Sequence, residues 1–316
     1  MTPAKGSPMH RPAPRLLCLT LGSIALLASC GGGGGDAGSP PPVVTLSSVS
    51  NVRYSETMTI TLVGSNLDQS LTLVSDGCRD FARSAGSTAT NLTLTCTVSG
   101  KTGAQAVTVS GGGVTAATVP FTVPVPQVTM VIGGAPGGSA TLVITLAPDL
   151  APKTVDNFLG YVKRGFYNGT VFHRHGRFPD LSTFVMQGGE FDGPVSSTAR
   201  FPTAKAVLAP IALERALSHV RYTVGMARLN DPNSATAGFF FNTVDNRAQL
   251  DGDGSAANPG YAAFGTVTAN TALVDTMAGA PCLLSAINFN QPQSTRPSAD
   301  CVPEPNLILS GALQTR

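Results

Sequence analysis

Tryptophan is absent from this chain of 316 residues, and charged residues make up only 12% of it. The formal net charge is +2 and no stripe of basic residues occurs, which argues against nucleic acid as a partner. No Cys-x-x-Cys spacing occurs either, so the cysteines do not indicate a metal site. The abundant residues are Gly, Thr, Val, Ser and Ala, a composition that favours β structure in an exported protein.

The first residues are typical of a targeting segment. Residues 16–27, LLCLTLGSIALL, form an apolar run that follows Lys5, Arg11 and Arg15. The run is too short to span a bilayer but suits the centre of a signal peptide. The sequence LASC, ending at Cys30, resembles the lipobox of bacterial lipoproteins. An ordinary signal peptide with a chance cysteine is the alternative.

The lipobox resemblance implies a location. Residues 1–29 would be the signal peptide, and Cys30 would carry the lipid that attaches the protein to a membrane. Gly31 after the cysteine favours the outer membrane, so we expect a periplasmic, lipid-anchored protein of a Gram-negative bacterium. Residues 30–42 are rich in Gly and Pro, which predicts a flexible and then extended tether.

The six cysteines fall into pairs. Cys18 leaves with the signal peptide and Cys30 is the lipid site. The other four predict two local disulfides in an oxidising compartment, Cys78–Cys96 and Cys282–Cys301. In the chain-entropy model each loop of about twenty residues is worth roughly 3 kcal/mol.

Residues 43–123 contain six short runs of β-forming residues separated by turn residues. Such spacing predicts a small antiparallel β-sandwich. The GSNL after the second run resembles bacterial Ig-like domains of the IPT/TIG kind. We interpret this sandwich as a spacer or adhesion module, with binding of a partner or of cell-wall glycan as the alternative. The VPVP at 123–126 is the expected linker.

Residues 127–316 combine strands with two helices. The runs QVTMVI and ATLVITL predict a first hairpin. Apolar residues three and four apart from Val155 to Val162 predict an amphipathic helix, with Pro152 near its start and Gly165 after its end. Further strands are expected at 169–175, 184–191, 223–228, 239–245, 263–268 and 306–311, and a second helix at 270–279. The fold class is therefore mostly β, a closed antiparallel barrel capped by two helices after the sandwich.

Several motifs of this second part stand in a known order. They are APKTVDNFLGYVKRGFYNGTVFHR, FVMQGGEF, TVGMAR, SATAGFFFN and GYAAFGTV. Together they resemble the cyclophilins, which are peptidyl-prolyl cis-trans isomerases, over roughly residues 130–315. The similarity is to periplasmic bacterial members, because SAT precedes the Phe run and a Tyr precedes AAFG.

The resemblance implies site residues. Arg174 matches the catalytic arginine, Gln187 the glutamine that steadies it, and Phe184 belongs with them. The residues implied for substrate binding are Val185, Ala227, Arg228 with its backbone, Phe240, Leu250 and Tyr261. Strand alternation adds that Phe172 and Arg174 share one face, with His173 and His175 on the other.

Some positions depart from the family pattern. Gly238 stands where the family usually has a glutamine that helps to bind substrate, and Gln249 stands where members have Trp or Phe. The HGRFPDLST segment after Arg174 is longer than usual and is expected to reshape the groove entrance. Tyr222 replaces a common glycine.

The function that follows is isomerisation of X–Pro bonds in exported proteins, by a monomer with no cofactor and no metal. Its partners would be proline-containing polypeptide clients. A holdase or scaffold that binds proline segments with little turnover is the alternative, favoured by Gly238 and Gln249. A third hypothesis makes the N-terminal sandwich the functional part and the barrel its carrier.

Overall fold

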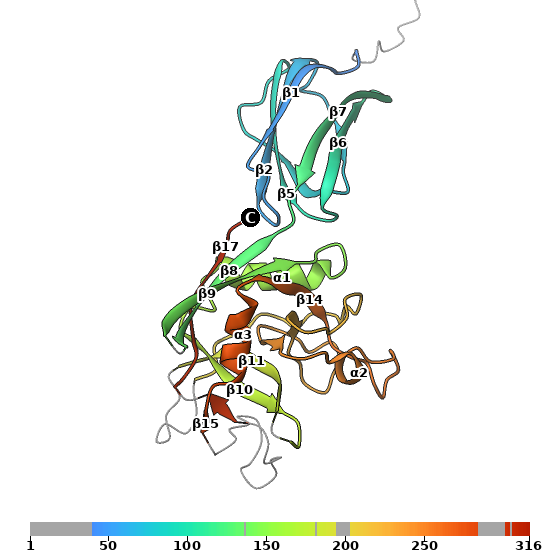
Figure 1. Ribbon diagram of the computed structural model, residues 1–316. Helices are drawn as coiled ribbons and strands as arrows, with labels where there is room; N and C mark the ends of the chain where they lie inside the picture. The colour runs from blue at the N-terminus through green and yellow to red at the C-terminus, as the bar shows by residue number, and fades with distance from the viewer. Residues whose placement is uncertain (1–39, 136, 181, 194–202, 284–300, 304) are drawn as a thin grey trace, which may run out of the picture. The chain divides into compact units, whose positions relative to one another are not determined.

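The computed structural model describes residues 40–135, 137–180, 182–193, 203–283, 301–303 and 305–316. The predicted signal peptide, the lipidation site Cys30 and most of the predicted tether lie outside these residues, so those expectations stay predictions. Figure 1 shows the chain coloured from its N-terminus to its C-terminus.

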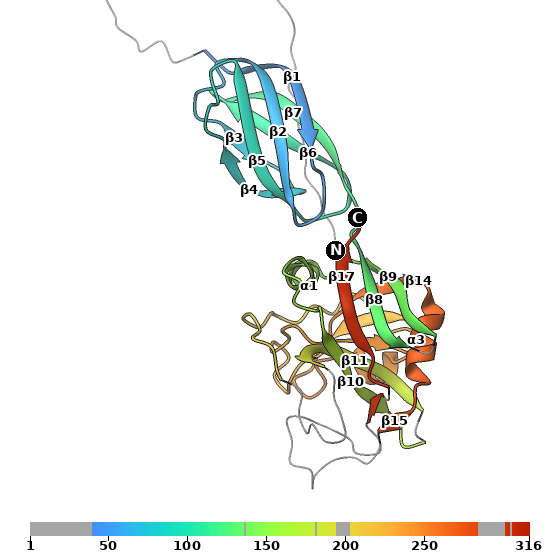
Figure 2. The same cartoon turned by 90° about the vertical axis from the view of Figure 1, so that its left-hand side faces the viewer.

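Two small antiparallel sheets form the first part of the described chain, and Figure 2 shows them facing each other. The first sheet has the strand order β1 (Val43–Ser50), β2 (Thr57–Ser65), β5 (Asn91–Val98) and β4 (Cys78–Arg83). The second has the order β3 (Thr72–Val74), β6 (Gly103–Gly111) and β7 (Val114–Val123). Buried and less buried residues alternate along β2 and β5, as expected for strands with one face in a core.

The six predicted runs correspond to β1, β2, β3, β5, β6 and β7. Strand β4 was missed, because CRDFAR carries three charged residues and exposes most of its side chains. The Ig-like identity of this part stays a prediction.

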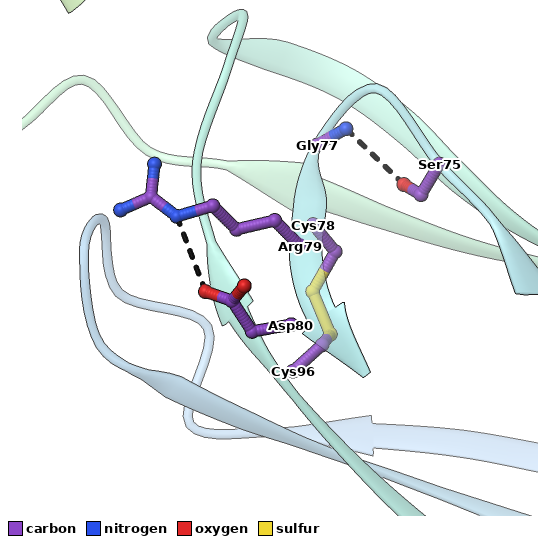
Figure 3. The surroundings of a disulfide bond; sticks show 6 residues. All are labelled: Ser75, Gly77, Cys78, Arg79, Asp80 and Cys96. Carbon is purple, nitrogen blue, oxygen red and sulfur yellow. Dashed lines mark hydrogen bonds and ion pairs between the residues drawn. A yellow bond between two sulfur atoms is a disulfide. The ribbon is translucent and has the colours of Figure 1, made fainter. Parts of the chain in front are cut away.

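The predicted disulfide between Cys78 and Cys96 is present and joins β4 to β5 (Figure 3). The two Cα atoms lie 5.8 Å apart and both cysteines are buried. Beside it, Arg79 lies 3.4 Å from the Asp80 carboxylate at the exposed side of the strand. For the predicted Cys282–Cys301 pair, Cys301 is disulfide-bonded but the side chain of Cys282 is not described, so this pairing stays a prediction.

A closed antiparallel barrel makes up the second part of the described chain, which confirms the predicted fold class. Its eight strands, in spatial order, are β10 (Thr170–Arg177), β11 (Thr183–Asp192), β13 (Phe239–Asn242), β12 (Thr223–Met226), β14 (Ala263–Ala269), β9 (Gly138–Leu146), β8 (Gln127–Ala135) and β17 (Ile308–Gln314). The last strand closes the barrel, since β17 pairs with β8 on one side and with β10 on the other.

The described residues contain the two expected helices, α1 (Pro152–Lys163) and α3 (Thr271–Ala278), and a single turn that was not expected, α2 (Arg247–Leu250). A short ladder pairs β15 (Cys282–Leu283) with β16 (Val302–Pro303). In the described part of the chain, no helix has the length and apolarity required to cross a membrane.

Helix α1 begins and ends as its sequence predicts. Pro152 occupies its first turn, and Gly165 follows its end with φ of +62°. A distant carboxylate caps its N-terminus: Glu214 accepts hydrogen bonds from the backbone N–H groups of Lys153 and Thr154 at 3.2 and 2.8 Å. This position satisfies two donors that lack helical partners and places negative charge at the positive end of the helix dipole.

Aromatic side chains fill the barrel interior. Phe158 of α1 packs on Phe264 and Phe239, with ring centroids 4.9 and 5.8 Å apart. Phe172 and Phe241 stack in the same cluster, and all five rings are buried. Side chains thus fill the interior of the barrel, so a binding site is to be sought outside this core.

Candidate active site

A cavity of about 160 Å³ lies on the other face of the same strands. Its lining consists of the nine residues that the sequence motifs implied for catalysis and substrate binding: Arg174, Phe184, Val185, Gln187, Ala227, Arg228, Phe240, Leu250 and Tyr261. The structure therefore brings all of the predicted groove residues together, although their individual roles remain expectations.

Three adjacent strands supply the centre of this cavity. Gln187 of β11 lies opposite Arg174 of β10 in one ladder and opposite Phe240 of β13 in the next. Direct cross-strand neighbours have Cβ atoms about 4.5–5.5 Å apart, so one face of the sheet sets the spacing of these side chains. Regular pairing over three strands thus fixes a cation, an amide and an aromatic ring side by side.

The wall of the cavity is an apolar cluster separate from the barrel core. Val185, Phe240 and Leu250 are 3%, 4% and 9% exposed, and Phe184, Ala227 and Tyr261 pack against them. The ring of Tyr261 meets Phe240 nearly at right angles, with centroids 6.0 Å apart. The size and lining of this slot suit a small apolar ring.

Arg174 is held by a neutral partner. Its Nη1 donates to Oε1 of Gln187 at 3.0 Å, and the side chain is half-buried. An amide oxygen accepts this hydrogen bond without contributing a charge of its own, so the contact with Gln187 orients the guanidinium at the rim of the apolar slot.

The expected faces of β10 need a correction. Phe172 lies in the barrel core against Phe239, whereas Arg174 lines the cavity, so the two do not share a face. The reason is a β-bulge. Phe172 pairs with Gly188 and Arg174 pairs with Gln187, so the partners are two residues apart on β10 but adjacent on β11. His173 is the extra residue, and its insertion turns Arg174 away from the core.

The two histidines that flank Arg174 are buried and neutral. Burial lowers the pKa of His173 to about 3 and that of His175 to about 4. Both rings therefore remain uncharged at neutral pH and do not serve as proton donors there.

Another histidine was missed by the sequence reasoning. His219 is fully buried and stacks on Phe240, with centroids 5.6 Å apart and planes inclined by 19°. The Asn242 amide donates to its Nδ1 at 3.1 Å, so Nε2 carries the proton and donates to the carbonyl of Tyr261 at 3.1 Å. A single histidine in an irregular segment gave no signal in the sequence.

The hydrogen bonds continue behind the other walls of the slot. The amide of Asn246 donates to Oδ1 of Asn242 at 2.8 Å and to the backbone carbonyl of Phe184 at 2.7 Å. Hydrogen bonds therefore hold the backbone carbonyls of Phe184 and Tyr261 in place, and they also hold the His219 ring that packs against Phe240. Networks of this kind hold a binding site in one geometry before the ligand arrives.

Arg228 contributes more than the backbone that was expected. Its guanidinium carbon lies 4.1 Å from the centre of the Tyr261 ring, and its Nε donates to the carbonyl of Gly260 at 3.0 Å. The adjacent Ala227 donates its N–H to the carbonyl of Gly238 at 2.9 Å. This rim of the slot therefore carries a second, stacked cation.

The positions that depart from the family pattern have separate explanations. Gln249 is exposed and does not line the cavity. Phe178 of the longer segment after Arg174 packs on Phe184, with centroids 5.0 Å apart, and so extends the apolar wall. Tyr222 has φ of +70°, which explains why a glycine is favoured there.

A larger cavity of about 350 Å³ lies at the N-terminal sheets, between residues of β3 and β4. The guanidinium of Arg83 in its lining donates to the backbone carbonyl of Leu67 and, at 3.3 Å, to that of Gln69. Its charge therefore serves the local loop, and we assign no chemistry to this cavity. Among the described residues, no group of three His, Cys, Asp or Glu side chains is arranged to hold a metal ion.

A closed antiparallel barrel that carries an apolar slot, a guanidinium and an oriented amide defines a binding site for a small ring next to a polar bond. The comparisons with known proteins agree with this class. Residues 128–294 match the family described as "Cyclophilin type peptidyl-prolyl cis-trans isomerase/CLD".

Individual relatives support the same assignment. Peptidyl-prolyl cis-trans isomerase cyp18 of Streptomyces antibioticus is 45% identical over 141 residues, which are 44% of this chain and 77% of that protein. Peptidyl-prolyl cis-trans isomerase B of Escherichia coli (strain K12) is 36% identical over 154 residues, 48% of this chain and 87% of that protein. A peptidyl-prolyl cis-trans isomerase of Acinetobacter baylyi is 37% identical over 152 residues, 48% of this chain and 73% of that protein. The chain belongs to the cyclophilin family of peptidyl-prolyl cis-trans isomerases.

Proposed function

We propose that this isomerase acts on X–Pro bonds of exported polypeptides in the periplasm, with Arg174 as its catalytic group and the apolar slot as the seat of the proline ring. One observation carries the proposal. Arg174, Gln187 and Phe240 come from three adjacent strands and meet at one cavity of about 160 Å³.

The reaction sets a modest energetic demand. Rotation about an X–Pro bond has a barrier of about 20 kcal/mol and takes tens of seconds unaided. About a thousand turnovers per second would need roughly 10⁵-fold acceleration, or about 7 kcal/mol. No covalent bond forms or breaks, so the site needs neither a nucleophile nor an acid/base pair.

Arg174 would act on the nitrogen of the twisting bond. As the amide loses planarity its resonance weakens, and the proline nitrogen gains a lone pair that a guanidinium can hydrogen-bond. A hydrogen bond to a charged group is worth about 1.5–3 kcal/mol net, so Arg174 supplies only part of the acceleration. Its contact with Gln187 holds it in place before the substrate arrives, which avoids a reorganisation cost during the reaction.

The slot would supply much of the remainder. Val185, Phe240 and Leu250 would fix the proline ring and exclude water around the bond. A drier environment strengthens the hydrogen bond from Arg174, because the local dielectric constant falls. The acyl side of the bond can then rotate while the ring stays fixed.

The neighbouring strand end would bind the peptide backbone. By family resemblance, this edge consists of Ala227 and the backbone of Arg228. The N–H of Ala227 is already donated to Gly238, so substrate pairing at this residue must use its carbonyl. The stacked guanidinium of Arg228 would limit the space at the same rim.

A protease-coupled assay on a short X–Pro peptide tests the catalytic proposal. We expect the wild type to accelerate isomerisation and Arg174→Ala to lose most of that acceleration. Equal slow rates for the two proteins would instead favour the alternative, a holdase or scaffold that binds proline segments, for which Gly238 and Gln249 are the motivating features.

The proposed location rests on different observations. An apolar run at 16–27, Cys30 in a lipobox-like sequence and the Cys78–Cys96 disulfide all suit an exported lipoprotein. Mass spectrometry of the N-terminal peptide should find a lipid on Cys30. The Cys30→Ala variant should leave the membrane fraction, and unchanged membrane attachment would overturn the proposal.

A further inference from the structure

A second guanidinium lines the slot, on the side away from Arg174. Arg174 lies on β10, whereas Arg228 follows the end of β12, and strands β11 and β13 separate the two in the barrel. Neighbouring strands are about 4.8 Å apart, so the backbones that carry the two arginines are about 14 Å apart. Two cations therefore flank the slot, and the proposed reaction uses only Arg174.

Arg228 is held in place before any ligand binds. Its guanidinium carbon lies 4.1 Å from the centre of the Tyr261 ring. Its Nε donates to the carbonyl of Gly260 at 3.0 Å, and its Nη1 donates to the carbonyl of Leu229 at 2.8 Å. A side chain that is fixed in this way loses little conformational entropy when it binds a further group.

The groups that hold Arg228 are all neutral. Elsewhere on the surface, Arg221 and Arg247 lie 2.9 and 2.6 Å from a carboxylate oxygen. Within the described chain Arg228 pairs with no carboxylate, and its Nη2 donates to no described residue. The half-buried side chain thus offers an N–H donor and a positive charge to a ligand at the rim.

No acidic residue shares the lining with Arg228. The described residues around the cavity include two arginines and neither Asp nor Glu. The carboxylate of Glu190 lies outside the lining, in the space beside Gly238, with an oxygen 3.8 Å from Nε2 of His173. The carboxylate of Asp251 accepts a hydrogen bond from the backbone N–H of His219 at 2.7 Å. The groups that a peptide meets in the slot are therefore apolar or positively charged.

We propose that Arg228 is a specificity-determining residue, which favours X–Pro substrates that carry an acidic side chain close to the proline. The inference rests on the proposed function of this site. The apolar slot takes the ring and rejects a carboxylate, so the acidic group stays at the rim, where it accepts a hydrogen bond from Nη2 of Arg228. An extended peptide advances about 3.3 Å per residue, so positions within about three residues of the proline come within reach.

The expected preference is modest, because the rim is partly exposed to solvent. Ion pairs in such places discriminate by about two- to fivefold, and salt weakens them. Complementary charge of this kind acts on the choice of partner more than on the chemical step. Arg228 would therefore select among clients, while Arg174 acts on the bond.

The test compares matched peptides that differ only in Glu or Gln at one position. Short Ala-based peptides with a single proline carry either residue at each of the three positions before and after it. Exchange NMR measures the catalysed isomerisation without a coupled protease and yields the ratio of kcat/KM for each pair. For the wild type we expect the Glu peptide to be favoured by about two- to fivefold at one or more positions. The preference should shrink between about 20 mM and 500 mM NaCl.

Three variants assign this preference. Arg228→Gln should bring the ratio close to one, and Arg228→Lys should retain part of it, because the charge remains while the planar fork is lost. Arg164→Gln is the matched control and should keep the wild-type ratio. Arg164 also lies over a tyrosine ring, 5.0 Å from the centre of Tyr161, but it does not line the slot. A general loss of activity cancels in the ratio, and thermal unfolding of each variant reveals misfolding.

A ratio close to one for the wild type at every position would overturn the inference. It would also fail if Arg228→Gln left the preference unchanged, or if Arg164→Gln lowered it as much, since other groups or the net charge would then be responsible. A wild type no faster than Arg174→Ala would instead overturn the proposed catalysis. Calorimetric affinities of the same peptide pairs would then decide this inference, with the same ratios expected for the same variants.

Discussion

The ring of His219 lies flat against the ring of Phe240, with centroids 5.6 Å apart and planes inclined by 19°. One face of Phe240 is thus supported by a fixed imidazole, and the residue also lines the slot. The hydrogen bonds at both nitrogens of His219 prevent this support from turning. A packed aromatic wall of this kind holds one side of the slot in a fixed position.

Replacement of Arg174 should impair catalysis and spare the fold. Loss of one hydrogen bond to a charged group is worth about 1.5–3 kcal/mol, so Arg174→Ala should lower kcat/KM by about 10- to 100-fold. Arg174→Lys should restore only part of the activity, because it lacks the planar fork. Arg164→Ala, at the exposed C-terminal end of α1, is the matched control and should leave kcat/KM unchanged. Similar losses in the two alanine variants would contradict the assignment.

Acid should destabilise the barrel through its buried histidines. The pKa values of His173 and His175 are lowered to about 3 and about 4, so these rings stay neutral in the fold. The unfolded chain binds protons below about pH 6.5, and the stability contributed by the neutral rings is lost as pH falls from there toward those lowered values. At pH 5 each should reduce the free energy of unfolding by about 2 kcal/mol relative to neutral pH.

Urea unfolding at pH 5 and pH 7.5 checks this prediction. Glu190 opposes the trend, because its raised pKa makes the folded state bind a proton more readily than the unfolded chain. The His175→Gln variant should show a smaller difference between the two pH values than the wild type. The same difference in the wild type and in His175→Gln would contradict the lowered pKa of His175.

Tyr222 carries a backbone conformation that its side chain partly offsets. It has φ of +70°, while its hydroxyl donates to Oδ2 of Asp275 at 2.9 Å. Tyr222→Ala keeps the strained backbone and loses the contact, whereas Tyr222→Gly loses the contact and relieves the strain. The glycine variant should therefore be more stable than the alanine variant by about 1 kcal/mol in urea unfolding. An alanine variant that matches or exceeds it would show that the positive φ is not costly.

The Cys78–Cys96 disulfide should matter for stability and not for turnover. It closes a segment with a sequence separation of 18 residues within the N-terminal sheets. The Cys78→Ser/Cys96→Ser variant should lose about 3 kcal/mol in the unfolding of that part. Its kcat/KM on a short peptide should equal that of the wild type at 25 °C. A large drop in activity would show that these sheets support the catalytic slot.

The secondary structure could be predicted from the sequence wherever a local pattern of residues determines it. Alternation and turn residues located the barrel strands, and Pro152 and Gly165 marked the ends of α1. The resemblance of the sequence motifs to the cyclophilins identified every residue that lines the slot. Alternation failed at His173, because a bulge adds one residue and a two-residue period cannot show on which strand it falls.

Other features depend on contacts between distant segments. The position of Glu190 beside Gly238 follows from the pairing of β11 with β13, and the support of Phe240 by His219 follows from the path of an irregular segment. Neither has a spacing or composition that marks it in the sequence. Strand β4 was missed because its side chains are mostly exposed and carry charge.

Closure of the barrel by β17 has a consequence for how the protein is made. The strand Ile308–Gln314 sits between β8 and β10, so the ring stays open until the whole chain between the end of β8 at Ala135 and the start of β17 at Ile308 has been synthesised. Until then two edges with unpaired backbone groups are available to other chains, a recognised route to aggregation. A chain truncated before Ile308 should therefore be insoluble, and a chaperone that shields sheet edges during synthesis and export would raise the yield of the complete protein.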